Sequence, residues 1–175
     1  MSNITYRDKI LPRKKLVLLV KTLREVGKKI VMTGGMYDLL HPGHTRFLEE
    51  AKKQGDILIV ALNSDTSTRR NKGSHRPIQK QQFRAEVIAA LASVDYVTFF
   101  SELTPEKIIR EIQPDIWAKG IEYKNKFMPE AKTVTSHGGQ IRILPPKKIC
   151  SVSDIVEKIL RDEPRKEKQK GSFIR

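Results

Sequence analysis

The sequence predicts an α/β protein in which helices cover both faces of a parallel five-stranded sheet. Short apolar runs typical of buried strands alternate along the chain with longer patterns typical of amphipathic helices. Parallel strands need a crossover connection, so this alternation favours a parallel sheet in three α/β/α layers. The 175 residues show no internal repeat and no interior linker, and we therefore expect one core domain.

The individual elements follow from the same patterns. Strands are expected where apolar residues run together, at 29–33, 57–62, 96–99, 116–118 and 140–144. Helices are expected where apolar residues recur with helical spacing, at 43–54, 80–91, 105–112 and 153–160, after a leading helix at 13–26. The residues between the second strand and the helix at 80–91 are expected to form a loop.

Three segments differ in composition. An N-terminal basic segment with its helix (1–27) precedes the core domain (28–160), and a basic tail (161–175) that we expect to be disordered follows it. The two ends hold much of the net charge of +14.

Composition also limits the partners. Aromatic residues make up 6% of the chain and are not interleaved with basic ones, so a nucleic-acid partner is not expected. The apolar stretch 16–20 is too short for a signal peptide or a membrane span, which predicts a cytoplasmic protein with no membrane partner. The single cysteine, Cys150, excludes an intrachain disulfide and a cysteine-cluster metal site.

The segment from Val31 to His44, V-M-T-G-G-M-Y-D-L-L-H-P-G-H, predicts a phosphate-binding site. Thr33-Gly34-Gly35 is expected to be a turn that a ligand can approach closely. Pro42 suits the first turn of the helix that follows. His41 and His44 are three residues apart in that turn, beside free backbone N–H groups and the positive end of the helix dipole. An anion is stabilised at such a position.

Further polar residues follow the later strands. Ligands of open α/β sheets bind beyond the carboxyl ends of the strands, so we expect these residues in one composite site. They are Asn63, Asp65, Lys72, Arg76, Lys119 and Glu122. Neither G-x-G-x-x-G nor G-x-x-x-x-G-K-[ST] occurs, so a dinucleotide oxidoreductase or a P-loop NTPase is not expected.

The ordered motifs resemble the H-x-G-H nucleotidyltransferase superfamily, which is cytidylyltransferase-like. From about Leu16 to Leu160 the chain is most similar to the adenylyltransferases that make ADP-heptose from D-glycero-β-D-manno-heptose 1-phosphate. The shared motifs are T-G-G-M-Y-D before H-P-G-H, G-D-I-L-I-V-A-L-N-S-D, K-G-S-H-R-P, P-D-I-W-A-K-G-I-E-Y, and H-G-G-Q-I-R-I-L followed by C-S-V-S-D-I-V. The resemblance implies a Rossmann-like nucleotidyltransferase fold and transfer of AMP from ATP to a sugar 1-phosphate, with release of pyrophosphate.

The resemblance also implies roles for single residues. A catalytic role falls to His41, His44 and Lys119, which would contact phosphate oxygens. Nucleotide binding falls to Gly35, Met36, Tyr37, Gly43, Glu122, Ser151 and Ser153. Acceptor binding falls to Asp38, Asn63, Asp65, Lys72 and Arg76.

Simpler structural roles remain open for several of these residues. Asp38 alternatively fixes the turn or caps the helix, and Ser153 alternatively is a plain N-cap. Asn63 and Asp65 alternatively belong to an ordinary turn after a strand. Arg84, which matches an arginine common in the family, is expected to be an exposed helical residue.

Departures from the family pattern bear on the substrate. Gly34 and Tyr37 stand where asparagine and phenylalanine are common. The arginine that precedes the last motif in cytidylyltransferases is absent, and Lys147 or Lys148 would replace its charge. The absence favours ATP and a heptose phosphate over the alternative, a cytidylyltransferase acting on a phosphoalcohol such as glycerol 3-phosphate. A non-catalytic nucleotide-binding protein is a further alternative.

The implied cofactor is Mg²⁺ arriving with ATP. A triphosphate holds Mg²⁺ with few protein carboxylates, so no metal-ligating residues are predicted. The resemblance also implies a homo-oligomer, a dimer or tetramer, and the apolar helix at 16–26 is the candidate interface.

Overall fold

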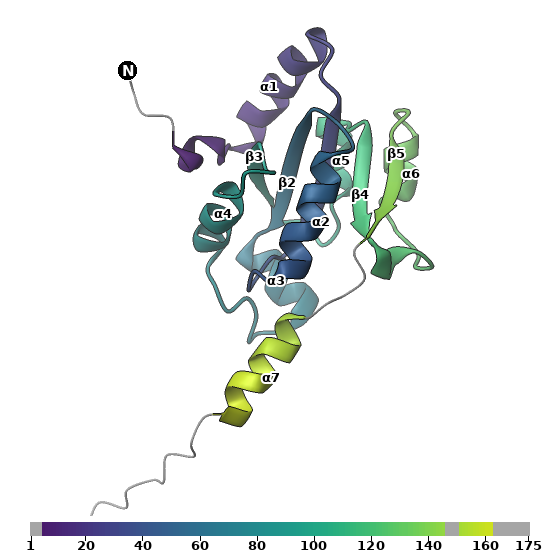
Figure 1. Cartoon of the computed structure of the whole chain (residues 1–175). Coiled ribbons are helices and arrows are strands. Elements are labelled where there is room, and N and C mark those ends of the chain that lie inside the picture. Colours follow the sequence, from purple (N-terminus) through teal and green to yellow (C-terminus); the bar gives the residue numbers. More distant parts are fainter. Residues whose placement is uncertain (1–4, 146–150, 163–175) are drawn as a thin grey trace, which may run out of the picture.

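The computed structural model of the chain describes residues 5–145 and 151–162. Within these residues one sheet contains the strands β1 (Ile30–Gly35), β2 (Ile57–Asn63), β3 (Tyr96–Phe100), β4 (Ile116–Gly120) and β5 (Gln140–Leu144) (Figure 1). The helices are α1 (Arg13–Glu25), α2 (Pro42–Lys52), α3 (Asp65–Lys72), α4 (Gln81–Ala89), α5 (Glu106–Ile112), α6 (Ala131–Thr135) and α7 (Val152–Asp162). Short 3-10 turns form η1 (Tyr6–Lys9) and η2 (Ile121–Tyr123).

All strand pairs are parallel, in the order β3-β2-β1-β4-β5. From β1 the chain adds β2 and β3 on one side, and then crosses back to add β4 and β5 on the other. The strand order therefore reverses between β1 and β4, which is where open α/β sheets form a ligand crevice. The predicted parallel five-stranded sheet is confirmed.

The central strand β2 shows why the sheet is covered on both faces. Leu58, Val60 and Leu62 belong to one buried cluster, together with side chains of α2 and α4. Ile59 and Ala61, which alternate with them, belong to a second cluster with side chains of α1, α5 and α6. All five β2 residues are fully buried, as expected of an inner strand in a three-layer α/β/α fold.

Two local predictions were wrong. Gly34 and Gly35 do not form a turn: they end β1 and pair with Ala61 and Leu62 of β2. The turn comes later, where Tyr37 has a positive φ of 45°. The expected loop after β2 contains α3, which Ser64 caps by accepting a hydrogen bond from the Ser67 backbone at 3.2 Å.

The segments at the ends of the chain are partly described. Leu16 and Val20 of α1 are buried in the core of their own chain, so the apolar face of this helix is largely used within the monomer. At the other end α7 continues to Asp162, two residues past the expected boundary, and projects from the body (Figure 1). Lys147, Lys148, Cys150 and the expected tail from residue 163 lie outside the described residues.

None of the helices in the described residues combines the length and apolar character that a bilayer span requires.

Candidate phosphate-binding site

A cavity of about 710 Å³ lies at the carboxyl ends of the strands. Its lining comes from β1 and the following loop, the ends of β2 and β4, the end of α3, η2 and the start of α7. Most of the sequence-predicted site residues line it: Gly35, Met36, Tyr37, Asp38, His41, His44, Asn63, Lys72, Arg76, Lys119, Glu122, Ser151 and Ser153. Gly43 and Asp65 are not among the lining residues. Most of the residues expected in the composite site therefore line one cavity.

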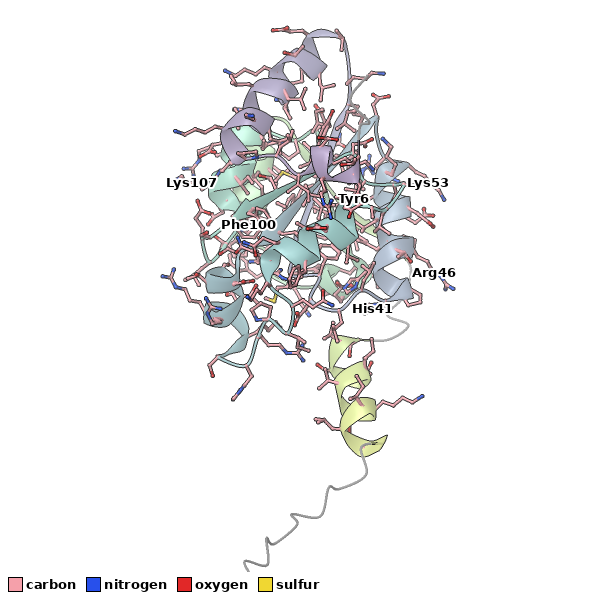
Figure 2. All side chains as sticks on the ribbon, turned by 90° about the vertical axis from the view of Figure 1, so that its left-hand side faces the viewer. Tyr6, His41, Arg46, Lys53, Phe100 and Lys107 are labelled. Carbon is pink, nitrogen blue, oxygen red and sulfur yellow. The ribbon has the colours of Figure 1, made fainter. Side chains whose placement is uncertain are left out.

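The two histidines form a stacked pair in the cavity wall. His41 is the N-cap residue of α2, and its carbonyl accepts a hydrogen bond from the His44 backbone at 2.8 Å. The rings stack with centroids 3.7 Å apart, and the Tyr37 ring lies 5.0 Å from that of His44. Figure 2 shows His41 at the end of the body that faces α7. The pair thus presents two imidazoles beside the N-terminus of α2, where an anion is favoured.

Gly43 supports this pair instead of lining the cavity. A Cβ atom at Gly43 would lie 3.0 Å from His41 Nδ1, closer than real Cβ contacts usually come. The absence of a side chain there leaves room for the His41 ring. Gly43 was expected to bind the nucleotide. In the structure it instead leaves space for the His41 ring that stacks on His44.

His44 is neutral at physiological pH in this site. Burial, together with the charge of His41, lowers its pKa from 6.5 to about 4. Its Nδ1 atom is buried and has no hydrogen-bond partner among the described residues. A phosphate oxygen beside the ring would favour the protonated form and raise this pKa.

Affinity for a polyphosphate is therefore expected to increase as the pH falls from about 7.5 to about 5.5, because the complex binds a proton that the free protein does not. Calorimetric titration of inorganic pyrophosphate in buffers of different ionisation enthalpy measures this proton uptake. His44→Gln is the control, since it removes the group but leaves the titration of pyrophosphate itself. Equal proton uptake by both proteins would contradict the assignment.

The stability of the unliganded protein is expected to change with pH in the opposite direction to its affinity for polyphosphate. Because the folded pKa of His44 is depressed, the unfolded chain binds its proton first. The free energy of unfolding should fall as the pH drops from about 6.5 towards 4.

Gly34 is explained by the side chain that faces it. A Cβ atom at Gly34 would lie 2.9 Å from the outermost indole carbon of Trp117, which is fully buried on β4. Likewise, a Cβ atom at Gly35 would lie 2.8 Å from the Tyr37 ring. The two glycines thus make room for aromatic rings, and the departure from the family asparagine at position 34 follows from Trp117.

We expect Gly34→Asn to lower the free energy of unfolding by about 1–3 kcal/mol, because the new side chain overpacks against the indole. Adding Trp117→Leu should recover part of the loss, which chemical denaturation of the two single variants and the double variant measures. Strictly additive losses would show that the two positions do not compete for space.

Asp38 holds the loop before α4 in place. Its carboxylate accepts backbone hydrogen bonds from Ile78 and Gln79 at 2.8 and 2.9 Å, and an ion pair from Arg76 at 3.0 Å. The side chain is buried. Of the two structural roles considered for Asp38, these contacts match fixing the turn and not capping the helix. The residue also lines the cavity, where acceptor binding was expected.

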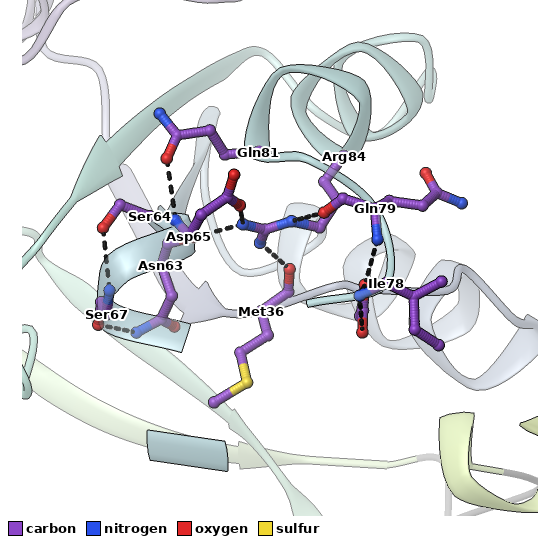
Figure 3. A network of polar contacts seen from close by, with 10 residues as sticks. Met36, Asn63, Ser64, Asp65, Ser67, Ile78, Gln79, Gln81 and Arg84 are labelled. Carbon is purple, nitrogen blue, oxygen red and sulfur yellow. Dashed lines mark hydrogen bonds and ion pairs between the residues drawn. The ribbon is translucent and has the colours of Figure 1, made fainter. Parts of the chain in front are cut away.

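The expected exposure of Arg84 was wrong, since its side chain is fully buried. It donates to the carbonyls of Met36, Asn63 and Gln79, and to the carboxylate of Asp65 at 2.8 Å (Figure 3). One guanidinium thereby ties together the loop after β1, the end of β2 and the start of α3. Asp65, expected to bind the acceptor, instead pairs with Arg84 outside the cavity lining.

The remaining acceptor candidates lie on the same side of the cavity. The Asn63 amide donates to Ser67 Oγ at 2.9 Å, so the residue belongs to the turn that begins α3 while also lining the cavity. Lys72, at the end of α3, is exposed. Arg76 is half-buried and pairs with Asp38. This side therefore offers two cationic side chains to an acceptor phosphate.

Opposite them lies Lys119, at the end of β4. Its ammonium is nearly buried, pairs with Glu130 at 3.0 Å and lies 4.3 Å from the centre of the Tyr123 ring. Sequence reasoning missed Glu130, which lies between two of the motifs and looks like a surface residue. Glu122 lines the same wall, with its carboxylate folded back over Gly120.

Ser151 and Ser153 line the cavity from the start of α7. Ser151 is the residue that caps the helix: its hydroxyl accepts from the Asp154 backbone at 3.2 Å, and its backbone donates to the Asp154 carboxylate at 2.7 Å. The alternative that Ser153 is the N-cap was therefore wrong. Ser153 lies exposed in the first turn.

The doubly wound parallel sheet, with paired histidines at the start of the helix after β1, has the arrangement in which α/β proteins hold phosphates at the switch point of the sheet. The chain belongs to the cytidylyltransferase-like family, whose model matches residues 32–169.

Curated relatives agree with the family assignment. The chain is 48% identical over 133 residues to the bifunctional protein HldE of Haemophilus influenzae (strain PittEE), a match that covers 76% of this chain and 28% of the relative. It is 45% identical over 150 residues to the bifunctional protein HldE of Actinobacillus succinogenes, covering 86% and 32%. The chain thus spans about a third of the length of these relatives.

Solved structures agree as well. A lipopolysaccharide core biosynthesis protein from Thermoplasma volcanium is 37% identical, with a TM-score of 0.55 and coverage of 67% of this chain and 94% of that one. Pantoate-beta-alanine ligase from Francisella tularensis has a TM-score of 0.57 at 15% identity, covers 88% and 79%, and shows the shared fold alone.

Proposed function

We propose that this protein is a nucleotidyltransferase that transfers AMP from ATP to a sugar 1-phosphate, D-glycero-β-D-manno-heptose 1-phosphate, and releases pyrophosphate. The observation that carries the proposal is the composition of one cavity. It joins a stacked histidine pair at a helix N-terminus with Lys119, at the end of β4, and with Lys72 and Arg76, which follow β2 on the other side of β1. Such a cavity offers cationic side chains to two phosphorylated substrates, with the charges of Lys119 and Arg76 offset in the free protein by Glu130 and Asp38.

The geometry supports a mechanism without a protein nucleophile. The acceptor's phosphate oxygen attacks the α-phosphorus of ATP, and the bond to the β-phosphate oxygen breaks. The protein's work is to align the two polyanions and to stabilise the charge that grows on the α-phosphoryl oxygens. His44 and His41 donate from the N-terminus of α2, and Lys119 supplies the charge from β4.

The cavity also fits Mg²⁺ carried by ATP. Asp38 and Glu130 are engaged in ion pairs, whereas Glu122 lines the cavity and has no ion pair among the described residues. Glu122 would meet the metal directly or through water, while the phosphates supply most of its ligands. Bound Mg²⁺ would neutralise charge on the departing pyrophosphate.

Three observations support the proposed acceptor. The ordered motifs resemble heptose-phosphate adenylyltransferases, and the Thermoplasma volcanium relative is described as a lipopolysaccharide core biosynthesis protein. A cavity of about 710 Å³ is also large enough for two substrates of this kind.

Pyrophosphate release tests the function. ATP or CTP is offered with Mg²⁺ against heptose 1-phosphate, other sugar 1-phosphates and glycerol 3-phosphate. We expect release with ATP and the heptose. Preference for CTP with glycerol 3-phosphate would establish the phosphoalcohol alternative, and tight nucleotide binding with no release from any pair would establish a binding protein.

Two further properties are proposed with the function. The first is a cytoplasmic location, in line with the absence of a membrane-spanning helix from the described residues. The second is a homo-oligomer, for which exposed apolar residues of α4 and α7 offer a candidate interface in addition to α1; these are Phe83, Val87, Ile159 and Leu160. Light scattering that gives the monomer mass would contradict the second.

A further inference from the structure

Glu130 is the most deeply buried acidic side chain of the cavity, with 5% of the side chain exposed. It directly precedes α6, yet its side chain does not cap that helix. Instead, Glu130 Oε1 accepts two bonds, from Lys119 Nζ at 3.0 Å and from the Trp117 indole N–H at 3.2 Å. Both donors come from β4, so the carboxylate joins the start of α6 to the carboxyl end of β4.

The carboxylate stays ionised in spite of its burial. Burial alone raises the pKa of Glu130, but the charge of Lys119 and the hydrogen bonds from its own backbone, Lys119 and Trp117 lower it below its usual value. A buried carboxylate is costly unless it is paired in this way. The pair therefore keeps the Glu130 carboxylate ionised at neutral pH.

Two aromatic rings lie close to the ammonium. Lys119 Nζ lies 4.3 Å from the Tyr123 ring centre and 5.2 Å from the Trp117 ring centre. Trp117 cannot move away easily, because its outer ring edge packs against Gly34 of β1. The lysine is thus held at one point by a carboxylate, two rings and the sheet behind them.

We propose that Glu130 is a positioning residue that acts through Lys119: it fixes the ammonium at the cavity wall and offsets its charge until the transition state. This inference rests on the proposed nucleotidyl transfer. An unpaired lysine would attract the ground-state triphosphate strongly, which does not speed the chemical step. A paired and immobile lysine attracts the ground-state triphosphate less, and its ammonium stabilises mainly the negative charge that develops on the phosphoryl oxygens in the transition state.

Two substitutions separate charge from position. Glu130→Gln keeps the size of the side chain and its acceptor oxygen, but it removes the charge. We expect ATP to bind about fivefold tighter and kcat to fall about tenfold. Glu130→Asp keeps the charge and withdraws the carboxylate by one methylene. We expect its Kd for ATP to stay near the wild-type value while kcat falls several-fold.

Glu102→Gln is the matched control. Glu102 is also paired, with Arg13, and its pKa is also lowered, but it does not line the cavity. This variant should bind and turn over ATP as the wild type does. A merely structural Glu130 would instead give weaker ATP binding in step with a lower melting temperature in both Glu130 variants.

Calorimetric titration of ATP and the fluorescence of Trp117, the single tryptophan of the chain, supply readouts other than turnover. The emission of the free protein should differ between wild type and Glu130→Gln, because the indole N–H loses a charged acceptor. Unchanged emission together with unchanged Kd would overturn the inference. If no acceptor supports turnover, the proposed function fails. The Kd for ATP and the Trp117 emission still test whether Glu130 positions Lys119 and offsets its charge.

Discussion

Replacing His44 by alanine is expected to lower kcat by about a hundredfold to a thousandfold. The ring lies at the N-terminus of α2, stacks on His41 and presents a buried nitrogen that lacks a partner among the described residues. Its bond to a phosphate oxygen is therefore expected to strengthen in the transition state, when negative charge grows there. Loss of that bond should affect kcat more than the Kd for ATP.

Folding should survive this change. His44 makes no side-chain hydrogen bond within the described residues, so its truncation leaves no polar group behind, and the melting temperature should stay within a few degrees. His75→Ala is the control, because His75 is exposed and does not line the cavity. Turnover by His44→Ala within a few-fold of wild type, with equal melting, would refute the role of the ring.

Replacing Arg84 by methionine is expected to lower the free energy of unfolding by about 3–5 kcal/mol, because it leaves buried partners without their donor. The carbonyls of Met36, Asn63 and Gln79 and the Asp65 carboxylate all depend on one guanidinium. The surviving folded protein should also show a raised KM for both substrates. Arg84 holds the loop after β1 against the end of β2, and each of these segments lines one side of the cavity.

Arg84→Lys separates charge from geometry. A lysine keeps the charge but cannot serve partners in several directions from one planar group, so we expect an intermediate loss. Arg69→Met is the control on the exposed surface of α3. Denaturant unfolding and steady-state kinetics measure both effects. An Arg84→Met protein as stable as Arg69→Met would contradict the network.

The sequence predicted the sheet well because β2 and its neighbours bury apolar residues on both faces, and such runs are readily recognised. It missed α3 because this helix is largely exposed and polar, with an apolar pattern too weak to show. The boundary at Gly34 and Gly35 was misjudged for another reason. Their lack of side chains makes room for Trp117 and Tyr37, which are distant or unremarkable in the sequence.

In the candidate site, too, some residues could be predicted from the sequence and others could not. His41, His44 and Lys119 stand out because motifs and strand ends mark them. Glu130 does not, and Arg84 was noted but expected to be exposed, since the importance of both comes from burial and from partners distant in the sequence. An arginine on a helix and a glutamate in a loop are normally exposed, and tertiary packing decides otherwise here.

The transfer of label from ATP tests the central proposal most directly. ATP carrying phosphorus-32 in the α-position, or in the γ-position, is incubated with Mg²⁺, heptose 1-phosphate and the protein. Nucleotidyl transfer predicts that the α-label enters the sugar nucleotide and that the γ-label appears in pyrophosphate. A γ-label on the sugar, or an α-label that stays in ATP, would contradict the proposed function.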